Sequence, residues 1–156
     1  MEDKRLLNVT VAGSDRPGVL ASLTEILVKH DVEIVDIKQS SLDRLLGLYL
    51  LLDLSHASQS EDGVIKDLLY LTKQLKLNLN FQSLPRAEAE AVSQGNLFVV
   101  THFGGTPFLA DLSKVLAEEN VNIQNMTIVN HHGARSTEMI VNVSKTTRLT
   151  RLKERI

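Results

Sequence analysis

The residues best placed for chemistry form the segment Gly13–Gly18, with the sequence GSDRPG, between an apolar run and a helical pattern. Its two glycines allow backbone angles and close approaches that a Cβ atom would prevent. Pro17 presets the backbone of a first helical turn, and Ser14 or Asp15 offers a side-chain oxygen to the free amides of that turn. The spacing predicts a strand-to-helix loop whose open amides suit a small anion such as a carboxylate. A turn and helix cap with no ligand is the alternative.

Other reactive arrangements are weaker in this sequence. Neither the G-x-S-x-G nucleophile elbow nor the phosphate-binding loop that ends in Gly-Lys-Ser/Thr occurs. His131 and His132 are adjacent, and adjacent strand residues point to opposite faces, so one metal ion would not take both from a strand. No third ligand lies nearby in the sequence, and we expect a solvated turn there. No catalytic residue, metal site or cofactor is predicted.

Composition narrows the class of protein. The chain has 156 residues, 43% hydrophobic and 23% charged, which is typical of a soluble globular protein. A net charge of -2 does not indicate binding to nucleic acid or to a membrane surface. The sequence has no cysteine, which excludes disulfides and thiol catalysis, and no apolar run of signal-peptide or membrane-spanning length, so we expect a cytoplasmic protein. The basic tail predicts a solvated helix face rather than a nucleic-acid contact, and its residues are Lys145, Arg148, Arg151, Lys153 and Arg155.

Apolar spacing outlines the elements of the first half. Five apolar residues at helical intervals follow the loop, and a nearly continuous apolar run at 45–54 is typical of a buried central strand. Alternating apolar and polar residues at 77–82 predict a half-buried strand. The predicted order is strand (6–12), helix (from 19), strand (32–42), strand (45–54), helix (64–75) and strand (77–81).

The same order returns in the second half. The apolar stripe of its helix lies 89 residues after that of the first helix at all five positions, for example Phe108 after Val19. The next strand keeps this offset, and register kept through helix, turn and strand indicates an internal duplication. The predicted second copy has a strand at 97–103, a loop at Gly104–Pro107 with Thr106 as cap and Pro107 in the first helical turn, a strand from 121, a turn at Gly133, a strand at 139–143 and a helix from 149.

The segment 85–95 has few large apolar residues and is predicted to be a linker, with a short helix as the alternative because of its alanine and glutamate content. Domains are therefore predicted at 1–84 and 96–156. The second copy has no counterpart of the 77–81 strand, so we expect it to be incomplete and the chain to be a fragment of a longer protein.

The element order predicts an α+β fold in which a ferredoxin-like βαββαβ module is built twice, with helices on one face of each antiparallel sheet and the second copy truncated. Right-handed crossovers place the first and third strands centrally and the second and fourth at the edges. The missing strand leaves the 97–103 strand with an unpaired edge, which favours association. We therefore expect a homodimer or a strand borrowed from elsewhere.

Two stretches give the chain a family resemblance. Residues 9–20, VTVAGSDRPGVL, followed by 32–40, VEIVDIKQS, resemble the ACT domain, a small amino-acid-sensing module. Two such modules in tandem resemble the N-terminal regulatory region of a bacterial or archaeal type of phosphoserine phosphatase. Runs at 36–40, 48–53 and 66–69 strengthen this narrower match, and the resemblance covers nearly the whole chain.

The resemblance implies a ligand site where two modules meet, with the strand-to-helix loop of one facing the second strand of the other. The loop amides would take the carboxylate of an amino acid, Asp15 or a main-chain carbonyl its ammonium, and Asn122 either group. The second loop is shorter and lacks the Asp-Arg-Pro-Gly pattern, so the first loop is favoured. Carried over by position, the ligand-binding residues are Gly13, Asp15, Arg16, Gly18, Gly104, Gly105, Asn122 and Gln124.

The resemblance also predicts a function. The leading interpretation is the amino-acid-binding regulatory region of a phosphoserine phosphatase in serine biosynthesis, with L-serine, or else glycine, as the ligand. Phosphatase chemistry in that family needs an Asp-x-Asp pair, which occurs nowhere in this sequence, so the chain itself is not expected to be an enzyme. The alternatives are a freestanding tandem regulator that resembles the glycine cleavage system repressor and acts through protein partners, and a pure dimerisation module.

Overall fold

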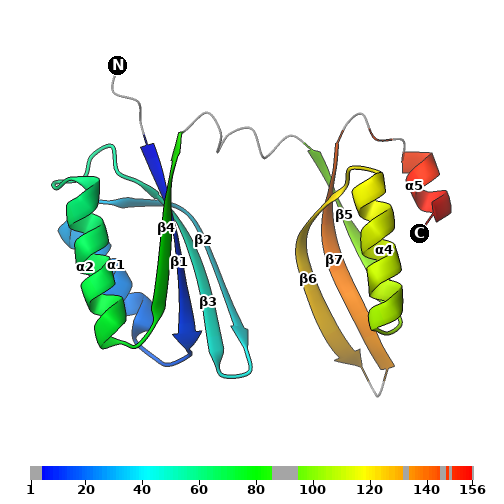
Figure 1. Cartoon of the computed structure of the whole chain (residues 1–156), viewed down its shortest axis with the longest axis horizontal. Coiled ribbons are helices and arrows are strands. Elements are labelled where there is room, and N and C mark those ends of the chain that lie inside the picture. The colour runs from blue at the N-terminus through cyan, green and yellow to red at the C-terminus, as the bar shows by residue number, and fades with distance from the viewer. Residues whose placement is uncertain (1–4, 86–94, 132–133, 145–146, 148, 156) are drawn as a thin grey trace. The chain divides into compact units, whose positions relative to one another are not determined.

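The computed structural model describes residues 5–85, 95–131, 134–144, 147 and 149–155. The chain divides into two compact units, Met1–Val92 and Ser93–Ile156, and each unit contains one antiparallel sheet (Figure 1). Several predicted features lie wholly or largely outside the described residues, namely the interior of the linker at 85–95, His132 of the histidine pair, the turn at Gly133, and Lys145 and Arg148 of the basic tail.

The first unit is a four-stranded sheet in the order β2-β3-β1-β4, with both helices on one face (Figure 1). The prediction that the first and third strands are central and the second and fourth lie at the edges is confirmed. This order follows from right-handed crossovers, which return each helix to the same face of the sheet. The elements are β1 (Arg5–Ser14), α1 (Val19–Lys29), β2 (Glu33–Leu42), β3 (Leu45–Asp53), α2 (Glu61–Gln74) and β4 (Asn78–Pro85).

Alternate residues of the two central strands build the core of the first unit. β1 and β3 pair over nine positions, and their inward side chains pack against α1 and α2. Leu48 and Leu52 are fully buried, whereas Leu45 and Tyr49 are 58% and 49% exposed. The apolar run at 45–54, predicted to be a buried strand, is central but is buried on one face only. The reason is that helices cover a single face of this antiparallel sheet.

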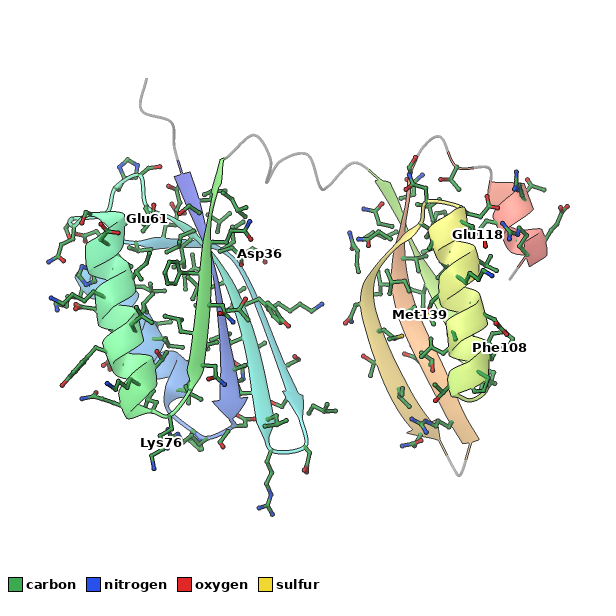
Figure 2. The ribbon with its side chains drawn as sticks, viewed as in Figure 1. Asp36, Glu61, Lys76, Phe108, Glu118 and Met139 are labelled. Atoms are coloured by element: carbon green, nitrogen blue, oxygen red, sulfur yellow. The ribbon has the colours of Figure 1, made fainter. Side chains whose placement is uncertain are left out.

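The second unit is a three-stranded sheet in the order β5-β7-β6. Helix α4 packs on one face through Leu112 and Leu116, and Leu152 of α5 joins the same apolar cluster. Met139 lies in this cluster, on the side of β7 that faces α4 (Figure 2). The elements are β5 (Gly95–Phe103), α4 (Thr106–Glu118), β6 (Asn122–His131), β7 (Ala134–Ser144) and α5 (Leu149–Arg155).

Backbone irregularities recur at the offset of the duplication. The register shifts at Ile34–Asp36 in β2 and at Ile123–Asn125 in β6, which is 89 residues later. Asp31 and Asn120, which follow α1 and α4 at the same offset, both have a φ of 54°. A non-glycine residue in the left-handed region is uncommon, so a matching pair is informative. The repeat inferred from apolar positions thus extends to bulges and helix ends.

Ion pairs hold the helices of each unit together. Nε2 of His30, a buried residue that follows α1, donates to Oδ2 of Asp67 in α2 at 2.9 Å, and Nζ of Lys29 lies 3.1 Å from the same oxygen. The hydrogen bond from His30, followed by that from Lys29, lowers the pKa of Asp67. In the second unit, Nη2 of Arg155 donates to Oε2 of Glu118 at 2.6 Å, and this hydrogen bond lowers the pKa of Glu118.

The basic residues of α5, Arg151, Lys153 and Arg155, are exposed, as predicted. They do not form an isolated positive patch. Arg155 also donates to Glu119, and Nε of Arg151 lies 3.1 Å from Oε1 of Glu119. Two arginines of the tail are thus neutralised by carboxylates of α4, which weakens the case for a nucleic-acid contact further.

The Asp67 cluster predicts how stability changes in acid. A carboxyl whose pKa is lower in the folded state stabilises the fold above its unfolded pKa, ordinarily 3.8, and this stabilisation is lost as pH falls through the lowered value. The substitution Asp67→Asn should therefore flatten the dependence of unfolding free energy on pH below about 4. Urea unfolding at pH 7 and pH 3 measures this, with Asp62→Asn on the exposed side of α2 as control. Equal pH dependence in Asp67→Asn and the wild type would contradict it.

Candidate functional site

The loop between β1 and α1 forms a helix start without a side-chain cap. Gly18 is the N-cap residue, with φ 93° and ψ -12°, and no side-chain oxygen bonds to the first turn of α1. The predicted cap was therefore wrong: Ser14 is the last residue of β1, and Asp15 is directed elsewhere. Pro17 precedes the helix rather than lying in its first turn. The left-handed Gly18 delays the start of the helix beyond both polar residues.

Asp15 fixes the loop to the turn between β2 and β3. Its N–H donates to the carbonyl oxygen of Arg44 at 2.8 Å, and Oγ of Ser41 donates to its Oδ2 at 2.6 Å. Strand register brings these groups together, because Ser14 pairs with Leu45 while Ser41 pairs with Leu46. The carboxylate is thus oriented and remains exposed at the loop.

Arg16 fixes the other side of the loop to α2. Its guanidinium Nη2 donates to the carbonyl oxygen of Leu75, which is the C-cap residue of α2. Carbonyl groups at a helix C-terminus lack helical donors and carry partial negative charge, so a guanidinium is favourable there. Arg16 joins the loop to the second helix and also lines the cavity at the loop, and its predicted contact with a ligand stays a prediction.

Gly13 packs closely against a neighbouring side chain at the other end of the loop. A Cβ atom at this position would lie 2.6 Å from Cδ2 of Leu77, a buried residue just before β4. Real Cβ contacts of this length are essentially not seen, so a larger residue would displace Leu77. The two glycines of the loop therefore serve different purposes: one leaves room for a neighbour, and the other permits the left-handed backbone.

A cavity of about 430 Å³ opens at this loop. The first helical hydrogen bond of α1 runs from the N–H of Ser22 to the carbonyl oxygen of Gly18 at 2.9 Å, so the three amides before Ser22 have no helical acceptor. The first-turn residues that carry these open amides therefore line one space together with Asp15, Gln39 and Leu46. The lining residues are Asp15, Arg16, Pro17, Gly18, Val19, Leu20, Ala21, Gln39 and Leu46.

Sequence reasoning missed Gln39, Ser41 and Leu46 as parts of this site. They reach it because β2 and β3 form a hairpin whose turn lies beside the end of β1. The turn predicted at Asp43-Arg44 was the available signal, since a short hairpin turn fixes which residues of the two strands face each other.

The second loop is built differently. Gly105 is the N-cap of α4 and Thr106 is already helical, so the predicted Thr106 cap was wrong, while Pro107 lies in the first turn as predicted. Behind this loop the buried ring of His102 stacks on Phe108, with ring centroids 3.6 Å apart. Gly104 covers the stack closely, because a Cβ there would lie 2.6 Å from Cε1 of His102. Aromatic packing therefore occupies the space beneath the second loop.

Asn122 and Gln124 lie away from the second loop. Asn122, the first residue of β6, pairs with Asn142, which also pairs with Leu97 in β5, whereas Gly104 follows the opposite end of β5. Gln124 lies in the bulge of β6 and is exposed. The structure brings Gly13, Asp15, Arg16 and Gly18 together and Gly104 with Gly105; the pairing of Asn122 and Gln124 with the first loop stays a prediction.

Known proteins resemble this chain both in sequence and in three-dimensional structure. A family model described as the ACT domain matches residues 5–82. A UPF0237 protein of Methanopyrus kandleri is 35% identical over 74 residues, which cover 47% of this chain and 82% of the relative.

Two solved structures share the fold over most of the chain. A candidate glycine cleavage system transcriptional repressor has a TM-score of 0.70 at 15% identity, over 97% of this chain and 87% of its own. An unknown protein from Galdieria sulphuraria has a TM-score of 0.63 at 17% identity, over 88% of this chain and 80% of its own. At these identities the likeness establishes the fold alone. Among the residues that the structure describes, no helix is long and apolar enough to cross a bilayer.

The two helix-capping glycines predict different responses to alanine. Gly18→Ala should lower the free energy of unfolding by about 1–2 kcal/mol, because an L-residue at φ 93° is strained although its Cβ meets no atom within 4 Å. Gly105→Ala should be nearly neutral, because φ is -89° and the nearest atom, Cδ of Pro107, is 3.7 Å away. Urea unfolding of both variants is the measurement, and equal losses would contradict the assignment.

Proposed function

This chain belongs to the ACT domain family and is a relative of the UPF0237 proteins, and from that premise we propose that its first loop binds a small free amino acid. The observation that carries the proposal is the 430 Å³ cavity, which is lined both by Asp15 and by the residues of the first turn of α1. An amino acid carries one group of each charge on adjacent atoms. A site that offers amide donors beside an acidic acceptor matches that pattern.

Each group has a role in this proposal. The ligand carboxylate accepts hydrogen bonds from the free amides of the first turn of α1, where the helix dipole favours an anion. The ligand ammonium is held by Asp15, which Ser41 orients. Gln39 and Leu46 line the rest of the cavity, and the ligand that we propose for it is a small amino acid, serine or glycine. Arg16 carries the effect of binding to α2 through the carbonyl of Leu75.

We propose that the whole chain is a tandem regulator that acts through protein partners. The alignment with the candidate glycine cleavage system repressor covers 97% of this chain and 87% of the repressor chain. Two units of this kind therefore account for most of that repressor chain. Regulation then requires that the amino acid bind one arrangement of the units or partners more tightly than another. The coupling equals the difference between those two binding free energies.

A second candidate is the regulatory region of a phosphoserine phosphatase that senses L-serine. The runs at 36–40, 48–53 and 66–69 support it, since they carry the narrower sequence resemblance. Both candidates use the same loop and the same ligand chemistry. They differ in what the ligand-bound module acts on, a separate protein or a tethered catalytic domain.

Calorimetry with the substitution Asp15→Asn tests the proposed site. Asparagine keeps an oxygen for Ser41 but removes the charge, so binding of serine or glycine should weaken by roughly tenfold or more, as expected for a lost charged hydrogen bond. Asp62→Asn, in the first turn of α2 and so at the opposite end of that helix from Leu75, is the control and should bind as the wild type does. Absence of heat with either amino acid at millimolar concentration would refute amino-acid binding at this loop.

We also propose that the chain has no phosphatase activity of its own. The sequence contains no Asp-x-Asp pair, which supplies the nucleophile and acid in the family that it resembles. Incubation of the purified chain with phosphoserine should therefore release no phosphate above the buffer blank. Release that scales with protein concentration and persists through repeated purification would overturn this proposal and the tandem-regulator proposal together.

A further inference from the structure

Helix α2 ends in a compact turn that leads into β4, and residues 72–77 of this turn are called the α2 cap. Lys76 has a φ of 53°, and its N–H donates to the carbonyl oxygen of Lys73 at 3.2 Å (Figure 2). The N–H of Leu77 reaches back to the carbonyl oxygen of Thr72 at 2.8 Å. Two such bonds around one left-handed residue form the Schellman motif, which satisfies carbonyl groups that a helix end leaves without helical donors. The carbonyl of Leu75, the C-cap residue, is not one of the two that this motif satisfies.

The candidate site contacts the α2 cap at two points. The guanidinium of Arg16 donates to the carbonyl oxygen of Leu75, and Arg16 also lines the cavity. Gly13 lies against the buried side chain of Leu77, because a Cβ on Gly13 would be 2.6 Å from Cδ2 of that residue. The loop therefore holds this helix end by a polar contact on one side and by close packing on the other.

Helix α1 ends in the same motif, in residues 27–32, but a different kind of donor completes it. Asp31 has a φ of 54°, and the N–H groups of Asp31 and Val32 reach back into the helix at 3.1 and 2.9 Å. The carbonyl of the C-cap residue His30 accepts from the backbone N–H of Ser58 at 2.9 Å. In α2 the same position is filled by an arginine side chain, which has rotatable bonds and loses entropy when it is ordered. Of these two helix ends, that of α2 is the one whose donor also lines the cavity.

The α2 cap is suited to respond to such a donor. Lys76 carries a Cβ in the left-handed conformation that glycine usually takes at this position, so the motif is less stable than it would be with glycine. β4 begins at Asn78, directly after the cap, and forms one edge of the four-stranded sheet. Helix ends fray, and segments that respond to ligands are drawn from the parts of a fold that open at low free energy.

We propose that the amino acid bound at the first loop stabilises the α2 cap through Arg16, so that the connection between α2 and β4 responds to occupancy; this inference rests on the amino-acid site proposed above. A guanidinium has several donors, and the bond to Leu75 leaves others for the carboxylate of the ligand. The cap and the ligand then share the entropic cost of ordering one arginine. By linkage, the cap strengthens binding by the same factor by which binding strengthens the cap.

Hydrogen exchange of the full chain, followed by NMR with and without saturating L-serine or glycine, tests the coupling. The amides of Lys76 and Leu77 should exchange roughly tenfold more slowly with ligand, as expected when one charged hydrogen bond is secured. The amides of Asp31 and Val32 belong to the matching motif of α1 and are the internal control. Their exchange rates should not change, because no side chain of the cavity contacts that motif in the proposed mechanism.

The substitution Arg16→Lys separates the positive charge from the forked guanidinium. An ammonium is a point charge without the planar fork, so it does not hold a carbonyl and a carboxylate together in one fixed geometry. Serine should bind this variant more weakly, and at saturation the slowing at Lys76 and Leu77 should fall below about threefold. Arg135→Lys, at an exposed position of β7 in the other unit, is the matched control and should keep the full slowing.

The outcomes distinguish this coupling from the binding site itself. Heat of binding without slower exchange at Lys76 and Leu77, or equal slowing in the motifs of both helices, would overturn the coupling and leave the amino-acid site standing. Full slowing in Arg16→Lys would overturn the coupling as well, because the fork of Arg16 would then not transmit it. Absence of heat with either amino acid would overturn the proposed site and the coupling together.

Discussion

Antiparallel pairing of β1 with β3 is the interaction on which the first unit depends. Its register buries Val9 and Val11 opposite Leu50 and Leu48, so one alternation supplies most of the core. The same register brings the end of β1 beside the β2–β3 turn. A shift of one residue would expose the core and separate Asp15 from Ser41, because strand side chains alternate between faces. Stability of the unit and geometry of its candidate site therefore share one cause.

The candidate site is a loop held from two sides. Asp15 attaches it to the β2–β3 turn and Arg16 attaches it to the end of α2, while Gly18 sets the direction in which α1 begins. A ligand that engaged the amides and the carboxylate would contact groups already connected to the sheet and to the second helix. Such connections allow binding at the loop to alter the packing of larger elements, which is the requirement for regulation.

The two copies keep the same backbone scaffold, but they differ at the loop after the first strand and at the edge of that strand. Bulges, left-handed helix ends and apolar stripes recur in both units. The first loop opens onto a cavity, whereas the space under the second is filled by the stacked rings of His102 and Phe108. The first unit covers the edge of β1 with β4, whereas the edge of β5 is open in the described residues. The two units therefore share a scaffold and differ at the loop that follows their first strand.

Periodicity in the sequence was sufficient to determine the elements, the repeat, the strand order and the GSDRPG loop, because apolar spacing and crossover handedness are local or nearly local constraints. Only the tertiary structure decided three other features. These are the helix cap at Gly18, the burial of β3 on a single face, and the contacts that Ser41 and Arg16 make. Ser41 lies 26 residues from Asp15, and Arg16 lies 59 residues from Leu75. Such contacts depend on how strands align and helices end in space, and no pattern within a single segment specifies them.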